Sequence, residues 1–227
     1  FCEGLPNNST LKTLELQRCQ LTDRQIACLL QSLAYHPTME TLNLSENHCR
    51  VEGLQALDRI LRTTASAATT VTETDHENQE ENNSNQHQDQ KQCCRIQTLD
   101  LSYQFTSEET FAMGERLELE LLLGSPQYRS TLYPHLHKLA LSGNQLQDPD
   151  MEHLAAVVRR FPQLHELDLR FNDITTEGLK LFAECSKQHL LSHHSSSNYR
   201  PPLGRIRTIR LTNNPLTNDA SQVILEL

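Results

Sequence analysis

Residues 136–146 read LHKLALSGNQL, and residues 164–174, which begin 28 positions later, read LHELDLRFNDI. Both stretches carry apolar residues at their first, fourth and sixth positions, an asparagine at the ninth and an apolar residue at the eleventh. The alternation around the fourth to sixth positions predicts a short strand with one face turned inward. The asparagine can bond to backbone groups of the adjoining coil, which a tight turn leaves unpaired.

The same phrase occurs along the whole chain. Its apolar triplets are Leu11-Leu14-Leu16, Met39-Leu42-Leu44, Ile96-Leu99-Leu101, Leu136-Leu139-Leu141, Leu164-Leu167-Leu169 and Ile206-Ile209-Leu211. The starts at 11 and 39 also differ by 28 residues, whereas the longer gaps of 57, 40 and 42 residues indicate insertions. The asparagine position is occupied by Cys19 in the first copy and by Gln104 in the third.

A helical pattern follows the predicted strands. Residues 23–33 and 151–161 each place apolar side chains on one helical face, and the longer third repeat predicts a helix over about 108–123. One repeat alone cannot bury these side chains, but stacked neighbours bury them between one another.

The pattern L-x-x-L-x-L-x-x-N/C-x-L, with its 28-residue period and a helix in each repeat, resembles the ribonuclease-inhibitor class of leucine-rich repeat proteins. The resemblance covers nearly the whole chain apart from the insertions, and Gln104 and the long third repeat depart from it. It implies an α/β fold, a right-handed leucine-rich repeat solenoid with a curved parallel sheet on its concave face and helices on its convex face. Strands are expected near 13–17, 41–45, 98–102, 138–142, 166–170 and 208–212.

The segment 63–95 has a different composition, rich in Thr, Asn, Gln and Glu and almost free of apolar residues. Such a segment cannot bury enough surface to order itself, so we expect a disordered insertion there. It separates N-terminal repeats (1–62) from C-terminal repeats (96–227) within one solenoid domain. Shorter loops are expected at 124–135 and 186–205, at the equivalent connection. This edge is either a site of neutral loop variation or one of regulation or partner capture.

The non-leucine positions of the predicted strands are expected to face outward across the concave side, Ser45, Ser102 and Ser142 among them. Tyr103 and Phe171 either anchor a partner or pack locally at the strand-to-loop turn. Aromatic residues and arginine are the usual anchors of protein interfaces, and acidic neighbours favour a partner with a basic face. The candidate partner-binding residues are Asp100, Tyr103, Lys138, Glu166, Asp168, Arg170, Phe171 and Arg210.

Composition limits the classes of partner. The net charge of −9 argues against a nucleic-acid backbone or an anionic membrane, because both attract concentrated Lys and Arg. No apolar run approaches the roughly 18 residues of a membrane-spanning helix. The seven cysteines form no C-x-x-C pair, which favours a reducing compartment, the cytoplasm or the nucleus. Apolar residues at both ends lack polar caps, so we expect the chain to be part of a longer repeat array or its ends to be covered by another segment.

No catalytic, metal or cofactor site is expected. Asp100 and Asp168 could form an acid/base pair, but such a pair needs a water-excluding cleft, and a concave repeat surface is open. His189, His193 and His194 have helical metal-ligand spacing but lie in the Ser-rich loop. The sequence therefore predicts a non-catalytic scaffold or sensor arm for protein–protein interaction. The alternative is a regulator of a small GTPase, because the resemblance extends to the Ran GTPase-activating proteins, in which an acidic tail commonly follows the repeats. The residues up to Leu227 include no such tail, which weakens this alternative without removing it.

Overall fold

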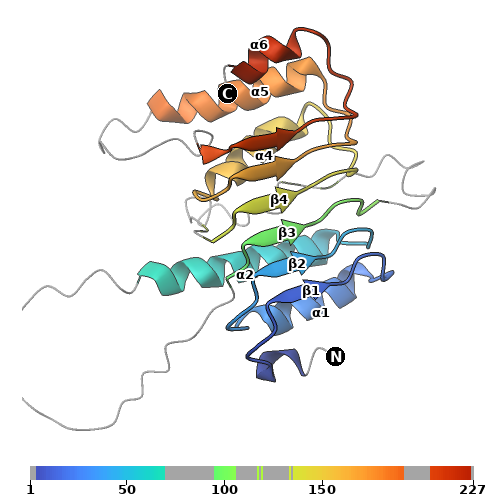
Figure 1. Ribbon diagram of the computed structural model, residues 1–227, viewed down its shortest axis with the longest axis vertical. Coiled ribbons are helices and arrows are strands. Elements are labelled where there is room, and N and C mark those ends of the chain that lie inside the picture. The colour runs from blue at the N-terminus through green and yellow to red at the C-terminus, as the bar shows by residue number, and fades with distance from the viewer. Residues whose placement is uncertain are drawn as a thin grey trace, which may run out of the picture.

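A parallel sheet runs the length of the molecule. The computed structural model describes residues 4–69, 95–105, 117, 119, 133, 135–191 and 205–225. Within them, six strands lie side by side in chain order (Figure 1): β1 Thr13–Glu15, β2 Thr41–Asn43, β3 Thr98–Asp100, β4 Lys138–Ala140, β5 Glu166–Asp168 and β6 Thr208–Arg210. Their register aligns the central apolar residue of every phrase, from Leu14 to Ile209. This arrangement confirms the predicted α/β repeat solenoid.

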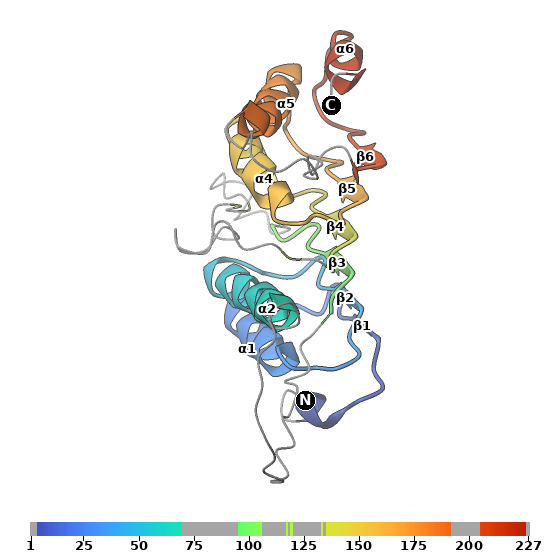
Figure 2. The ribbon, with the colours of Figure 1, turned by 90° about the vertical axis from the view of Figure 1, so that its left-hand side faces the viewer.

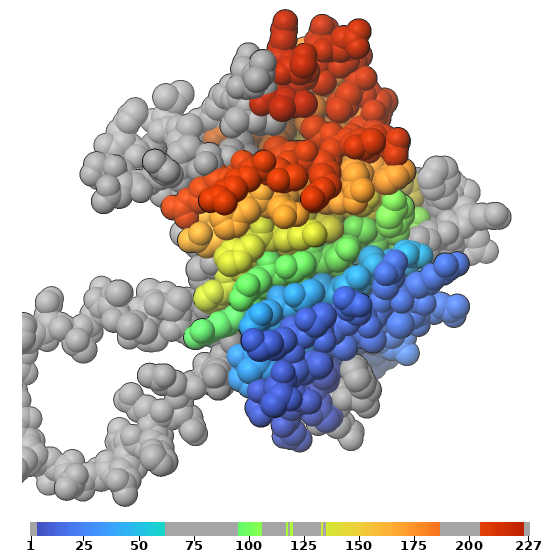
Figure 3. Space-filling view, in the orientation of Figure 1, coloured from blue at the N-terminus to red at the C-terminus, as the bar shows by residue number. Residues whose placement is uncertain are grey.

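Helices cover one side of the sheet. The 3-10 helix η1 covers Leu5–Asn7, and the α-helices are α1 Asp23–Leu33, α2 Val51–Thr69, α4 Asp150–Arg159, α5 Thr176–Leu191 and α6 Ala220–Leu225. Figure 2 shows the strands as a gently bowed column, with α1, α2, α4 and α5 in a second layer beside it, on the left. In Figure 3 the other side of the sheet lies open, and successive repeats cross it as adjacent bands. We call this open side the sheet face.

The core lies between these two layers. Leu42, Leu99, Leu139 and Leu167 of the strands are almost fully buried, together with the apolar faces of α1, α2, α4 and α5. Each such side chain contributes about 1.5–3 kcal/mol on burial. Because neighbouring repeats bury these side chains together, a single repeat would not be stable by itself.

Buried amide side chains link neighbouring repeats. The Asn172 amide nitrogen donates to the carbonyls of Leu141, Leu169 and Arg170, at 3.1, 3.0 and 3.2 Å. Its carbonyl oxygen accepts from the backbone N–H groups of Asn144 and Leu146, at 2.9 and 3.1 Å. One side chain therefore satisfies backbone groups of its own repeat and of the repeat before it.

Gln104 performs the same role in the third repeat. Its amide nitrogen donates to the carbonyls of Leu44 and Ser102, and its oxygen accepts from the N–H of Cys49 at 2.9 Å. Gln104 is fully buried. The departure from asparagine thus preserves the link between the second and third repeats.

A second set of links joins the turns that precede the helices. The Asp23 carboxylate accepts from the backbone N–H groups of Arg50, Glu52 and Gly53, at 2.7–2.8 Å, so it caps the start of α2 from the preceding repeat. Gly53 gives this carboxylate room, because a Cβ there would lie 2.8 Å from Asp23 Oδ1. The Asp148 carboxylate likewise accepts from Thr175 just before α5.

A buried ion pair connects the second repeat to the fourth. The Arg160 guanidinium lies 3.2 Å from Asp58 of α2, and the Tyr133 hydroxyl donates to the same carboxylate at 2.9 Å. The guanidinium also stacks over the Tyr133 ring, 4.2 Å from its centroid. All three side chains are almost fully buried, so removing one partner would leave a charge or a polar group without compensation.

Two helices run further than the sequence indicated. The insertion was expected to begin at 63, but α2 continues to Thr69 through three alanines, which favour helix. The loop was expected from 186, but α5 continues to Leu191, because residues 186–191 contain no glycine or proline. Residues 70–94, most of the third-repeat helix and of the 124–135 loop, and residues 192–204 with His193 and His194 lie outside the described residues.

His36 occupies an aromatic position of the core. Like Tyr133 and Phe161, it stands three residues before the first apolar residue of a phrase, and it is fully buried. Its Nε2 has no hydrogen-bond partner, and burial lowers the pKa of its imidazole. Protonation of His36 therefore opposes folding.

Replacement of Asn172 by Ala should lower the free energy of unfolding by about 2–4 kcal/mol, because it leaves buried backbone groups of two repeats unpaired. Urea denaturation monitored by circular dichroism measures this loss. Asn214→Ala is the matched control, since Asn214 makes the equivalent bonds at a half-buried position, and its loss should be smaller. Equal losses would contradict burial as the reason for the larger cost at Asn172.

Replacement of His36 by Phe should make the protein less sensitive to acid. The folded-state pKa of His36 lies below its unfolded value, so the unfolded chain takes up this proton first as the pH falls through about 6.5, and stability is lost there. Melting temperatures measured from about pH 8 to pH 5 should fall less steeply for H36F than for the parent chain. Parallel curves would show that His36 does not contribute to the acid sensitivity.

Candidate functional site

The sheet face is built from the strand positions between the inward leucines. Its middle column runs Glu15, Asn43, Asp100, Ala140, Asp168 and Arg210. Glu15 is exposed, Asn43, Asp100 and Arg210 are half-buried, and Ala140 and Asp168 are buried. The centre of the face is therefore more enclosed than its N-terminal end.

Short polar side chains in this column bind the backbone just beyond their strand. Asn43, Asp100 and Asp168 each accept from the N–H of the residue two positions later, at 2.9, 2.9 and 3.1 Å. Ala140 cannot do so, and the Ser142 N–H instead donates to the Ser102 hydroxyl of the preceding repeat at 3.2 Å. These bonds hold the chain in place where each strand ends.

The serine column is not part of the accessible surface. Ser45, Ser102 and Ser142 were expected to face outward, but all three are buried. The Ser45 hydroxyl donates to Asn43 of its own repeat, whereas the Ser102 hydroxyl accepts from the Ser142 N–H and the Ser142 hydroxyl donates to the Arg170 carbonyl at 2.9 Å, both across repeats. The prediction was therefore wrong for these three serines.

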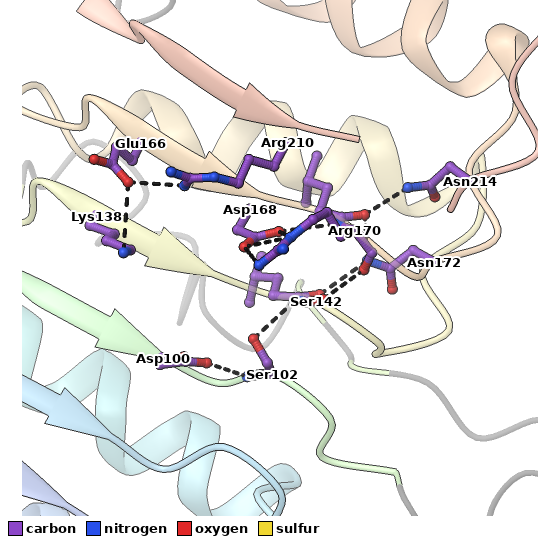
Figure 4. A network of polar contacts seen from close by, with 12 residues as sticks. Asp100, Ser102, Lys138, Ser142, Glu166, Asp168, Arg170, Asn172, Arg210 and Asn214 are labelled. Atoms are coloured by element: carbon purple, nitrogen blue, oxygen red, sulfur yellow. Dashed lines mark hydrogen bonds and ion pairs between the residues drawn. The ribbon is translucent and has the colours of Figure 1, made fainter. Parts of the chain in front are cut away.

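Asp168 and Arg170 form a bidentate ion pair on the face (Figure 4). Arg170 Nη2 lies 2.7 Å from Asp168 Oδ2, and Arg170 Nε donates to both carboxylate oxygens, at 2.9 and 3.1 Å. Asp168 is only 5% exposed. Burial alone would raise the pKa of its carboxyl, but hydrogen bonds from Arg170 and the charges of Arg170 and Arg210 hold it below its usual value. Asp168 therefore positions Arg170.

Glu166 binds two cations from the neighbouring strands. Arg210 Nη1 of β6 donates to its Oε2 at 3.0 Å, and Lys138 Nζ of β4 lies 3.7 Å from the same oxygen. The hydrogen bond from Arg210 and the charge of Lys138 lower the pKa of the Glu166 carboxyl. These side chains are more than a third exposed, so the pairs align charges across three strands and add little stability.

An aromatic pair lies beside these charges. Tyr103 and Phe171 have ring centroids 6.1 Å apart, although they belong to the third and fifth repeats. Between them, in the fourth repeat, stands Gly143, where a Cβ would collide with the Tyr103 ring. Phe171 is 47% exposed, and Tyr103 is half-buried. The two rings pack against each other, as the local-packing reading expected, and Phe171 still presents apolar surface, so a role in anchoring a partner stays a prediction.

The aromatic residues share an unusual backbone conformation. Tyr103 and Phe171 have φ angles of 55° and 56°, and the equivalent positions in the other repeats, Arg18, Glu46, Gly143 and Asn213, also have positive φ. Side chains other than glycine rarely adopt this left-handed region. The turn after every strand thus requires it, whatever residue stands there.

The candidate residues therefore fall into three contacts: Asp168 with Arg170, Glu166 with Lys138 and Arg210, and Tyr103 with Phe171. Asp100 bonds to the Ser102 amide and joins none of these side-chain contacts. Sequence analysis missed Gly143, although it is the one glycine in its column and could have indicated a close approach.

The chemistry available on this face is that of binding. A carboxyl with a lowered pKa, such as Asp168, is ionised at neutral pH and does not serve as a general acid. Among the described residues no group of three or more His, Cys, Asp or Glu side chains is placed to hold a metal ion. No helix in the described part of the chain is long and apolar enough to cross a membrane.

Comparison with known proteins supports this fold. The family model for the leucine-rich repeat matches residues 7–24, 35–57, 134–155 and 162–183. A stretch of 92 residues is 37% identical to part of Protein NLRC5 of Mus musculus. The matched stretch covers 40% of this chain and 4% of the mouse protein. The third and sixth phrases lie outside the family matches, yet β3 and β6 pair in the same sheet and register. The chain is therefore an α/β solenoid built of leucine-rich repeats.

Proposed function

We propose that this chain is a non-catalytic scaffold or sensor arm that binds a partner protein through its sheet face. Repeat solenoids present extended concave surfaces of this kind for binding. The observation that carries the proposal is the Tyr103–Phe171 pair over Gly143, flanked by the Arg170 guanidinium. Aromatic rings and arginine together are the side chains most enriched at the centre of protein interfaces.

The aromatic pair costs the fold more than a polar pair would. A bulky side chain in the left-handed region is strained by about 1 kcal/mol or more, and Phe171 leaves nearly half of its side chain in water. Asparagine is tolerated there, as Asn213 shows in the sixth repeat. A contact with another molecule would bury the apolar surface that the folded chain leaves exposed.

The charged residues are arranged before any partner arrives. Arg170 is held by Asp168 in a bidentate pair, so binding needs to immobilise little of this long side chain. Lys138, Glu166 and Arg210 hold one another across β4, β5 and β6. This pre-organisation favours a partner with polar groups that match fixed charges.

The sign of the partner's charge stays a prediction. The candidate partner-binding residues include three carboxylates and three cations, so their formal charges cancel. The carboxylates are Asp100, Glu166 and Asp168, and the cations are Lys138, Arg170 and Arg210. Glu166 and Asp168 are already bound by cations, whereas Asp100 accepts a backbone amide and is half-buried. We propose Asp100 as the carboxylate that would meet a basic group on the partner.

We also propose that the repeats are of the ribonuclease-inhibitor type. The 28-residue spacing of the phrases at 11 and 39 and at 136 and 164, with an α-helix after β1, β2, β4 and β5, supports this assignment. The same type includes regulators of small GTPases. A GTPase among the bound proteins would favour that alternative over a plain scaffold.

For the cellular compartment we propose the cytoplasm, with the nucleus as a second location. Cys19, Cys49 and Cys185 form no disulfide in the described part of the chain. Burial among apolar groups raises the pKa of the Cys49 thiol, which keeps it protonated and unreactive. Unpaired cysteines of this kind suit a reducing environment.

Replacement of Tyr103 and Phe171 by Asn should remove the partner without unfolding the chain. Asparagine accepts the left-handed backbone at both positions and deletes the aromatic surface. Affinity capture from cell lysate with parent and Y103N/F171N baits, quantified by mass spectrometry, should show one or more proteins reduced about tenfold or more with the variant.

The matched control is R18N/E46N, which changes the equivalent positions of the first two repeats. It should retain the partner, provided that all baits melt alike by circular dichroism. Identical protein profiles for the three baits would contradict the aromatic pair as the binding anchor. A GTPase lost with Y103N/F171N would then be assayed for stimulated GTP hydrolysis.

A further inference from the structure

The edge of the sheet where β4, β5 and β6 begin gathers basic side chains. His137, His165 and Arg207 each stand one residue before a strand, and their backbone N–H groups bond from repeat to repeat at 2.8–2.9 Å. The rings of His137 and His165 have centroids 5.3 Å apart. His135, Arg205 and Arg95 each lie three residues before their strands at the same edge. We call these six residues the edge cluster.

The edge cluster carries more positive than negative charge. Its six members are three arginines and three histidines, and Arg95 and Arg207 are exposed while the other four are half-buried. Arg205 Nη1 donates to the Pro162 carbonyl at 2.9 Å, which fixes its guanidinium beside the cluster. The carboxylate of Glu166, which follows His165 in the chain, is bound by Arg210 and Lys138.

The positions directly before β1, β2 and β3 carry no net charge. Lys12 and Glu40 occupy the first two of these positions, and their side chains form an ion pair of 3.1 Å. Gln97 follows them and carries no charge. Positive charge is therefore confined to the C-terminal half of this edge, in a chain whose formal net charge is −9. General surface composition does not account for such a local excess.

We propose that the edge cluster is a second binding surface, and that its ligand is an acidic, extended segment of a partner protein. Arginine and protonated histidine donate hydrogen bonds to carboxylates, and charge-assisted bonds of this kind are the strong ones. Three adjacent strands span about 10 Å, and alternate residues of an extended peptide are about 7 Å apart, so two carboxylates fit along the cluster. A long polyanion would meet the acidic remainder of the chain and be repelled.

Binding at this surface depends on pH. Burial, then the charges of Arg207, His137 and Arg205, lower the pKa of His165, and the charge of Glu166 opposes them. Burial and the charges of Arg95 and His137 lower the pKa of His135. Both rings are therefore mostly neutral near pH 7. A bound carboxylate favours their charged forms, so binding takes up protons and strengthens as the pH falls.

The test is fluorescence anisotropy with a short labelled peptide of alternating Glu and Ser, and with a Lys/Ser peptide of equal length. The Glu peptide should bind roughly tenfold more tightly at about pH 5.8 than at about pH 7.5. The R205Q/R207Q variant should bind it about tenfold or more weakly. H135Q/H165Q should bind with less dependence on pH than the parent chain, with His137 left in place. K12Q/R18Q, which removes two exposed cations at the opposite end of the sheet, should bind like the parent chain.

Arg205 also bonds to the Pro162 carbonyl, so its replacement could disturb the backbone. The single variant R207Q changes an exposed side chain and leaves that bond in place, so it repeats the test without this complication. The proposal is overturned if the Glu peptide does not bind, if K12Q/R18Q weakens binding as much as R205Q/R207Q does, or if the affinity is the same at both pH values. It is also overturned if the Lys peptide binds equally well, or if anionic lipid vesicles or single-stranded DNA bind more tightly than the Glu peptide. None of these variants alters the Tyr103–Phe171 pair, so the two proposed surfaces succeed or fail separately.

Discussion

The coil that follows each strand sets the main constraint on this structure. Its backbone N–H and C=O groups are enclosed between neighbouring repeats, where water cannot satisfy them, and an unpaired buried group costs about 1–3 kcal/mol. From the second repeat onwards, amide side chains at one position of the repeat satisfy groups of the neighbouring coils, those of the preceding repeat among them. Because one side chain serves two repeats, the spacing and the register of the strands are determined together. The buried amides are Asn47, Gln104, Asn144 and Asn172, with Asn214 half-buried at the last repeat.

The sequence was sufficient to predict the solenoid because its determinants are local and periodic. Leucines at fixed spacing gave the strands and their register, and the amide position could be read three residues after the last leucine of each triplet. The ends of α2 and α5 could not be predicted in this way. Both helices continue into segments that contain no glycine or proline, and the repeat pattern carries no information on where such an extension stops. Gln104 shows the converse, since its role depends on reach and burial, which the residue type alone does not reveal.

Prediction of the binding face was less complete, because burial there is decided by contacts between repeats. Asp168 and Arg170 alternate along the chain at β5, so a contact between them could be expected. The burial of Asp168 could not be predicted. Its neighbour in β4 is the small residue Ala140, and the Arg170 guanidinium is bound to its carboxylate. Ser102 and Ser142 are buried as well, and their hydroxyls bond to the neighbouring repeat. The spacing of residues along the strands predicts which face a side chain belongs to, but it does not predict how much of that side chain is accessible to solvent.

The turn that the buried amides stabilise also determines where this surface can vary. Each turn needs one residue with positive φ directly before the amide, and that residue contributes nothing to the core, so its side chain is free to differ between repeats. The aromatic rings stand at this position in the third and fifth repeats, and they meet because the fourth repeat has glycine there. A single Cβ at Gly143 would push Tyr103 away from Phe171. The aromatic surface is therefore a property of three successive repeats, and the constraint that builds the fold is also the one that holds its candidate binding residues in place.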